Sequence, residues 1–106
     1  MKHARLSPVA DVDLLAIYLF IAEQSGRDQA EHVVRVIRSK CETVAEASGI
    51  GRPRPELRDG VRSFAIWSFL VFYSEIESGI EVVRILHGAR DISAGDVSPE
   101  SRNAVP

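Results

Sequence analysis

The sequence predicts an α+β fold with the element order β-α-α-β-β-β, in which an antiparallel sheet packs against an N-terminal helical hairpin. Two long stretches in the first half of the chain, Val9 to Gln24 and Ala30 to Ala45, contain no Gly or Pro. Beyond Asp59-Gly60 the chain changes to three short runs rich in Val, Ile, Phe, Tyr and Trp. Helical stretches followed by consecutive strands are typical of the α+β class, with the helices covering one face of the sheet.

The first element is a short strand over residues 3–7, followed by a helix. Ser7 is a good N-cap, and Pro8 at the first helical position costs no hydrogen bond. The helix then runs from Val9 to Gln24 without a breaker. Its second half, Leu14 to Ala22, is apolar nearly all round. Such a helix is either buried on several sides or covered by a partner, and both readings stay open.

A second helix follows a turn at residues 25–28. Ser25 and Asp28 have the spacing of a capping box, so we expect them to cap its start. Apolar residues then recur at helical spacing up to Ala45, and Gly49 is the expected C-cap. Cys41 lies on this apolar stripe, which predicts a buried structural thiol. Because the connecting turn is short, the two helices should form an antiparallel hairpin.

The second half of the chain reads as a linker and three strands. Two prolines in Ile50 to Leu57 favour an extended, non-helical linker. The strands are expected over 61–67, 69–76 and 80–87, with a hairpin turn at Glu77-Ser78-Gly79. The strand at the N-terminus must then return to the sheet as an edge or central member.

Length and composition favour one domain. At 106 residues the chain has room for a single modest core. We expect residues 1–91 to form it and residues 92–106 to be a loosely ordered tail, since no apolar period continues there.

Location follows from the apolar segments and the cysteine count. The longest apolar stretch, Leu14 to Ala22, has about half the length that spans a bilayer. Near the N-terminus, Asp11 and Asp13 lie where a signal peptide would have its apolar region. A lone cysteine excludes an intrachain disulfide and a cysteine-based zinc site. We therefore expect a cytoplasmic protein with no membrane contact.

The charge balance argues against a strongly basic nucleic-acid binder. The chain has 13 basic and 15 acidic residues and a pI near 5.9, whereas direct binding usually needs a basic domain. We expect no sequence-specific nucleic-acid binding. Residues 49–67 are nevertheless locally basic. Arg52, Arg54 and Arg58 are either solvated loop charges or, with Arg62 and Arg84, part of a surface for an anionic partner.

Four segments in order resemble ParE-type toxins of the RelE/ParE superfamily. They are Ala10-x-x-Asp13-Leu14-x-x-Ile17, Gly51-Arg52-x-Arg54-x-Glu56-Leu57-x-x-Gly60-x-Arg62, Phe69-Leu70-Val71-Phe72-Tyr73, and Ile80 to Asp91. Together they span residues 7–91. One departure is Ile66-Trp67-Ser68, where many relatives carry a more polar turn with glycine.

The resemblance implies a fold, a partner and a target. ParE toxins are similar in fold to RelE ribonucleases, form a hetero-oligomer with a cognate ParD-like antitoxin, and poison DNA gyrase by binding it. No cofactor is implied. RelE-type relatives instead cut mRNA on the ribosome. A third hypothesis is a toxin fold that has lost toxicity and only binds its antitoxin.

Ribonuclease chemistry would need an acid, a base and cations on the phosphate. The candidate acids and bases are His87, Tyr73 and Glu56, and the candidate cations are Arg62, Arg84 and Arg90. The charge balance of residues 1–90 lacks the basic surface that docking on ribosomal RNA requires. We therefore expect no catalytic residues.

The resemblance instead makes Arg62, Arg84, His87 and Arg90 the candidates for target binding. A structural role at the end of a strand is the alternative for His87, and a simple pairing with Asp91 is the alternative for Arg90. For the antitoxin, we expect a groove lined by Tyr18, Phe20 and Ile21 on the apolar first helix. His3 and His32 stand alone, so no metal site is expected.

Overall fold

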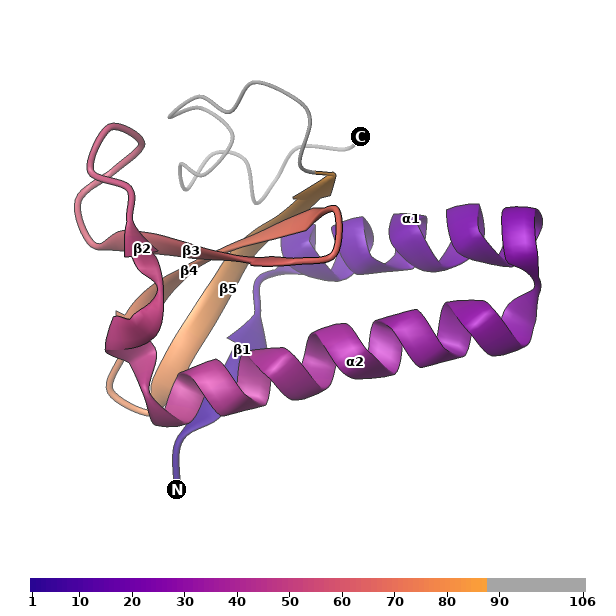
Figure 1. Ribbon diagram of the computed structural model, residues 1–106. Helices are drawn as coiled ribbons and strands as arrows, with labels where there is room; N and C mark the ends of the chain where they lie inside the picture. The colour runs from indigo at the N-terminus through magenta and orange to yellow at the C-terminus, as the bar shows by residue number, and fades with distance from the viewer. Residues whose placement is uncertain (88–106) are drawn as a thin grey trace.

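The computed structural model describes residues 1–87, and it confirms the α+β class (Figure 1). The elements are β1 (His3–Leu6), α1 (Pro8–Ser25), α2 (Arg27–Glu46), the 3₁₀ turn η1 (Ser48–Ile50), β2 (Arg52–Pro53), β3 (Val61–Ile66), β4 (Phe69–Ile76) and β5 (Gly79–His87). The expected tail, 92–106, and Arg90 lie outside the described residues.

The sheet is mixed, with strand order β1-β5-β4-β3-β2. Strands β3, β4 and β5 form the predicted antiparallel meander. The first strand, β1, returns to the sheet as an edge member, which is one of the two expected places, and it pairs with β5 in parallel, with His3 opposite Gly79, so the sheet is not antiparallel throughout. A further strand, β2, pairs with β3 at the other edge. Its Pro53 lies at a sheet edge, where a missing N–H is tolerated, so the proline-rich segment is not only a linker.

The start of α1 is as predicted. The Ser7 hydroxyl accepts a hydrogen bond from the Ala10 amide and donates one to the Val83 carbonyl, both at 3.1 Å. One side chain therefore caps the helix and fixes its first turn against β5. Of the aspartates near the helix start, Asp11 lies in the first turn. Asp13 has a different partner, described below.

The junction between the helices differs from the prediction. Helix α1 continues through Ser25, so the capping box of Ser25 and Asp28 is wrong. Gly26, with φ of 93°, alone separates the helices and caps α2 without a side-chain hydrogen bond. Glycine tolerates this left-handed backbone, so the chain reverses in one residue. Gly49 is likewise not the C-cap, because α2 ends at Glu46 and Gly49 belongs to η1.

The helical hairpin covers one face of the sheet, and its far end extends beyond it (Figure 1). The main core lies between them and joins apolar side chains of both helices to Phe69, Val71 and Tyr73 of β4. Cys41 is 1% exposed in this core, as predicted. A smaller cluster on the opposite face gathers around Phe72, under Leu57. None of the described helices meets the length and hydropathy needed to cross a membrane.

An irregularity in β5 explains its imperfect alternation. Phe72 pairs with Arg84 but Tyr73 pairs with Val82, so Val83 is an extra residue. This is a β-bulge. Because it shifts the alternation by one, apolar Val82 and Ile85, three positions apart, both belong to the core on the helical side.

Candidate partner-binding site

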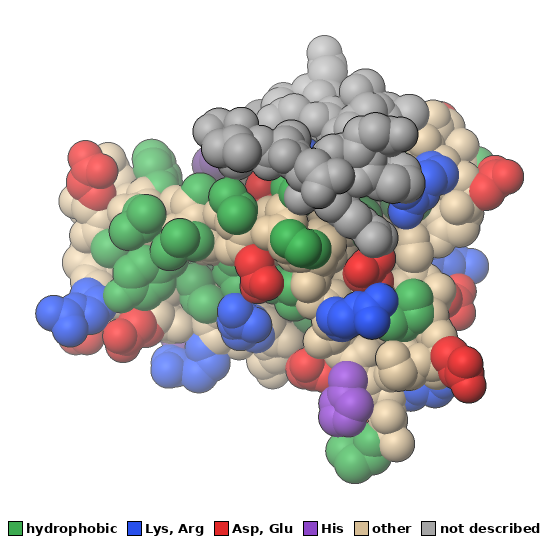
Figure 2. Space-filling view, turned by 180° about the vertical axis from the view of Figure 1, so that it is seen from behind, with side chains coloured by type: hydrophobic (Ala, Val, Ile, Leu, Met, Phe, Trp, Pro, Cys, Tyr) green, Lys and Arg blue, Asp and Glu red, His purple; other side chains and the backbone are tan. Residues whose placement is uncertain are grey.

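The exposed side of α1 is apolar. Val12, Leu15, Leu19 and Phe20 are between 42% and 58% exposed. Viewed down the helix axis, with 3.6 residues per turn, the outward-facing positions lie between the directions of Tyr18 and Phe20, which are about 200° apart. The polar members of this arc, Asp11 and Glu23, lie near the ends of the helix. Figure 2 shows the hydrophobic side chains gathered over the helical hairpin. The alternative of a thoroughly buried helix is therefore wrong.

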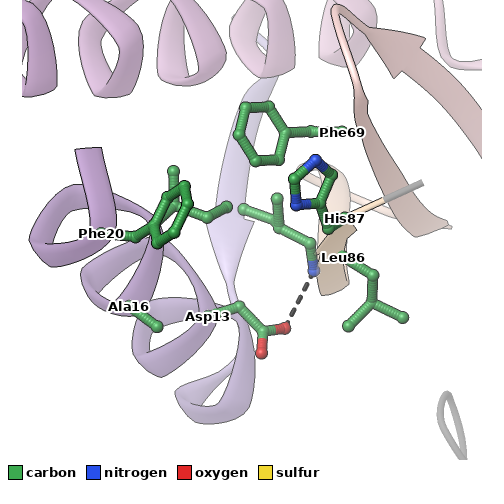
Figure 3. A pocket seen from close by; sticks show the side chains of 8 residues that line it. Asp13, Ala16, Phe20, Phe69, Leu86 and His87 are labelled. Carbon is green, nitrogen blue, oxygen red and sulfur yellow. Dashed lines mark hydrogen bonds between the residues drawn. The ribbon is translucent and has the colours of Figure 1, made fainter. Parts of the chain in front are cut away.

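A pocket of about 240 Å³ lies on one flank of this apolar arc, between α1 and the ends of β4 and β5. Figure 3 shows Phe20 of α1 facing Phe69 and His87 across it. The remaining lining comes from Asp13, Ala16, Ile17, Ile85 and Leu86. We call it the aromatic pocket. Its walls are mainly apolar, which suits an apolar side chain.

A second pocket, of about 200 Å³, lies on the other flank, between α1 and α2. Leu15 and Tyr18 of α1 face Val34 and Arg38 of α2 there. The apolar arc is thus a ridge with a hollow on each side.

The three expected antitoxin residues lie in different places on α1. Tyr18 lines the second pocket and Phe20 the aromatic pocket. Ile21 is half-buried against the main core, so it faces inward. Sequence reasoning missed Leu15 and Leu19, both exposed. Fixing the buried side of the helix at Ala10 and Leu14 would have found them from the helical period.

Asp13 joins α1 to β5. Its carboxylate accepts hydrogen bonds from Arg84 Nε at 2.8 Å and Arg84 Nη2 at 3.0 Å. It also accepts one from the Ile85 amide at 2.9 Å, drawn in Figure 3. Strand β1 ends opposite Val82 and does not reach Ile85. The carboxylate of Asp13 therefore accepts the hydrogen bond that a neighbouring strand would otherwise accept from the Ile85 amide. With its side chain only 13% exposed, Arg84 fits a structural role better than the target-binding role expected of it.

Arg62 holds the segment that leads into β2. Its guanidinium donates to the carbonyls of Gly49 and Gly51, and it lies 3.6 Å from Glu75. Tyr73 supports the same segment, donating to the Ser48 carbonyl at 2.7 Å and accepting from the Gly51 amide at 2.9 Å. Burial raises the pKa of Tyr73. Both side chains therefore fasten a loop.

The candidate catalytic groups are not gathered in one place. Tyr73 lies four residues along β4 from Phe69, which pairs with His87, a separation of about 13 Å along the strand. Glu56 is bound to Arg54 at 2.7 Å, and this hydrogen bond lowers its pKa. A carboxylate held ionised in this way is a poor proton donor.

Among the described candidates for target binding, His87 is exposed, whereas Arg62 and Arg84 are partly buried. The ring of His87 lies 5.2 Å from that of Phe69 at the mouth of the aromatic pocket. Arg90 lies outside the described residues, so its role stays a prediction. Within residues 1–87, no group of three or more His, Cys, Asp or Glu side chains is placed to hold a metal ion.

Comparisons with known proteins agree with this architecture. A solved structure titled "Chromosomal ParDE TA system from P. aeruginosa" has a TM-score of 0.70 at 25% identity, over 82% of this chain and 96% of that one. This likeness places the chain in the class of small α+β proteins that share the fold of a chain of that ParDE system.

Sequence relatives narrow the class to a family. The family described as "ParE toxin of type II toxin-antitoxin system, parDE" matches residues 4–92. Toxin ParE1 of Caulobacter vibrioides is 35% identical, over 89% of this chain and 97% of that protein. Toxin ParE1 of Mycobacterium tuberculosis is also 35% identical, over 82% and 90% respectively. The chain belongs to the ParE toxin family of type II toxin–antitoxin systems.

Proposed function

We propose that this ParE-type toxin acts in the cytoplasm, is neutralised by a cognate ParD-like antitoxin that covers α1, and inhibits DNA gyrase by binding it. The observation that carries the antitoxin proposal is the exposed apolar ridge of α1. Large side chains gathered on one surface of a small protein mark an interaction site. An amphipathic segment of the antitoxin would cover the ridge in a helix-in-groove mode.

Binding is favoured over catalysis because the described candidate groups other than His87 already have partners within the protein. Arg84 is bound to Asp13, and Arg62 holds backbone carbonyls. The hydroxyl of Tyr73 both donates and accepts a hydrogen bond within the protein. A ribosome-dependent mRNA endoribonuclease of the RelE type would need such groups turned toward the RNA. For gyrase, exposed His87 and the predicted Arg90 remain the contact candidates.

The antitoxin site is tested by charge placement on α1. Leu19→Glu puts a carboxylate on the ridge, where burying it against an apolar partner is costly. We expect a loss of antitoxin binding of 100-fold or more by titration calorimetry. Gln24→Glu is the matched control, because it adds the same group to α1 at an exposed position off the ridge. Equal binding by both variants would remove α1 from the interface.

The target is tested with the purified toxin released from its antitoxin. We expect inhibition of gyrase supercoiling in vitro, and growth arrest with DNA-damage induction on expression without the antitoxin. Rapid loss of mRNA without gyrase inhibition would instead support the endoribonuclease. No growth arrest at all would support a toxin fold that only binds its antitoxin.

A further inference from the structure

The turn between β3 and β4 carries an exposed tryptophan in an unfavourable backbone conformation. Trp67 has φ of 51°, in the left-handed region, and it is the sole non-glycine residue with positive φ among the described residues. Its side chain is 58% exposed, with the ring of His32 on α2 at 6.3 Å. Glycine or asparagine would fit this turn without strain. Strained residues of this kind cluster at functional sites.

The two edges of the sheet are protected differently. At the β1 edge, the amides of Lys2 and Ala4 donate to the carboxylates of Glu46 and Glu42, at 2.9 and 3.1 Å. These glutamates lie about one turn apart on α2, and this spacing is close to the distance between two amides that are two residues apart on a strand. The side chains of α2 therefore occupy the hydrogen-bonding groups to which another strand would pair.

The opposite edge has an open stretch on β3. Strand β2 pairs only with Arg62 and Ser63. The amide of Arg54 donates to the carbonyl of Val61 on this edge. Because outward-pointing groups recur every second residue, the N–H and C=O of Ala65 also point away from β4. Ala65 is exposed, and no strand among residues 1–87 pairs with it on this side.

This open stretch lacks the charged side chains and prolines that usually protect a sheet edge, and it leads into the turn that carries Trp67. Phe64, Ala65 and Ile66 carry no charge, whereas lysine or proline normally protects such an edge. Phe69, two residues beyond Trp67, lines the aromatic pocket together with Phe20. The open edge, the tryptophan and one wall of the pocket thus follow one another along the β3–β4 hairpin, from Ala65 through Trp67 to Phe69.

We propose that an extended apolar segment of the antitoxin adds to β3 at Phe64–Ile66 as an extra strand, with Trp67 as its anchor. This inference rests on the proposed function, because it extends the antitoxin contact from α1 to the sheet edge. Strand addition supplies affinity through main-chain hydrogen bonds. A large aromatic side chain at the end of the strand supplies a contact of the kind that dominates protein interfaces.

The anchor is tested with Trp67→Gly, measuring antitoxin binding by calorimetry and unfolding by urea. Glycine accepts the left-handed backbone, so the free energy of unfolding should stay unchanged or rise. Binding should weaken about 30-fold or more, as for an interface hot spot. Ile50→Ala is the matched control: it shortens another exposed apolar side chain, 61% exposed, and should leave binding unchanged.

The added strand is tested by the pair Ala65→Pro and Ala65→Ser. Proline removes the outward N–H, whereas serine keeps it, so only the proline variant should lose binding, by about 10-fold. Circular dichroism checks that both variants fold. Binding by Ala65→Pro equal to that of Ala65→Ser would overturn the added strand.

The remaining outcomes separate this inference from the proposed function. If Leu19→Glu abolishes binding while Trp67→Gly binds normally, the α1 site stands and Trp67 is not an anchor. If Trp67→Gly loses stability and binding together, the indole serves packing on α2 and the inference also falls. Normal binding by both variants would overturn both proposals.

Discussion

Arg84 and Asp13, 71 residues apart in the sequence, form a two-point ion pair that fastens the first helix to the last strand. Both side chains are largely buried, at 13% and 8% exposure. The same carboxylate accepts the Ile85 amide, so the charge of Asp13 is well satisfied. This contact fixes the end of the helical hairpin that carries the apolar ridge.

The ion pair gives the first prediction. Asp13→Ala removes the largely buried carboxylate that binds Arg84 and the Ile85 amide, and breaking a buried pair in this way costs about 3–5 kcal/mol. We expect that loss in the free energy of unfolding, measured by urea denaturation. The matched control is His3→Ala, because the His3 and Glu42 side chains are both exposed, at 68% and 53%, and lie 3.8 Å apart.

An exposed ion pair is typically worth about 0–1 kcal/mol, so the control should unfold nearly as the wild type does. A loss after Asp13→Ala no larger than the loss after His3→Ala would mean that the Asp13–Arg84 pair does not hold the hairpin.

Tyr73 gives the second prediction. Tyr73→Phe removes the hydroxyl that serves Ser48 and Gly51, and it leaves the Gly51 amide without that partner. An unsatisfied buried donor costs about 1–3 kcal/mol, and we expect destabilisation of that size. Tyr18→Phe is the control on the half-exposed ridge, where solvent replaces the hydroxyl's partner. Similar stability of the two variants would show that Tyr73 does not fasten the loop.

The local features of the fold were predictable from the sequence, whereas the pairing of distant elements was not. Ser7, Pro8 and the breaker-free helices are short-range signals, and the structure follows them. The parallel pairing of β1 with β5 joins His3 to Gly79, and no local pattern encodes that choice. The two-residue β2 is too short to show alternation, and its proline favours the prediction of a linker over that of a strand.

The candidate site was predictable in kind but not in all its residues. The apolar excess of Leu14 to Ala22 predicted exposed apolar surface on α1, because one face of a helix cannot bury so many apolar side chains. Which residues stay exposed depends on the contacts of Asp13 and Leu14 with distant strands. The same limit applies to Arg84: its sequence neighbours give no sign of the carboxylate that binds it.

Cys41 gives the third prediction. Its burial raises the pKa of the thiol from 9.0 to about 12. Since the thiolate is the reactive form, the folded protein should react far more slowly with a thiol reagent at pH 8 than the urea-unfolded chain. Cys41→Ser should destabilise by about 1–3 kcal/mol, because it buries a hydroxyl. Rapid labelling of the folded protein would place Cys41 outside the core.

The raised pKa also sets a dependence on pH. The folded state keeps the thiol proton above pH 9.0, where the unfolded chain loses it. The contribution of Cys41 to stability is therefore fully present below about pH 9 and is lost progressively as the pH rises toward 12. Unfolding of Cys41→Ala should lack this part of the alkaline dependence. Identical pH profiles of the two proteins would contradict the assignment.

His87 gives the last prediction, which separates the two mechanisms of toxicity. Its ring is exposed beside Phe69, in a place where it could serve either as an acid–base group or as a binding contact. His87→Gln keeps hydrogen-bonding capacity but cannot transfer a proton near neutral pH. In an endoribonuclease, removing such a group lowers the rate about 10²–10⁴-fold. In a gyrase-binding toxin, glutamine can still make the polar contact that His87 would make, so growth arrest should be nearly unchanged.

The measurement is growth arrest on expression without antitoxin, with circular dichroism and antitoxin pull-down confirming that the variant folds. Phe69→Leu is the companion variant: it removes the ring beside His87 and leaves the imidazole in place, so its toxicity should also persist. Suppose that His87→Gln abolishes toxicity in a folded, antitoxin-binding protein, and that mRNA cleavage disappears with it. The proton-transfer role would then explain both losses, and the endoribonuclease would replace gyrase binding as the function of this toxin.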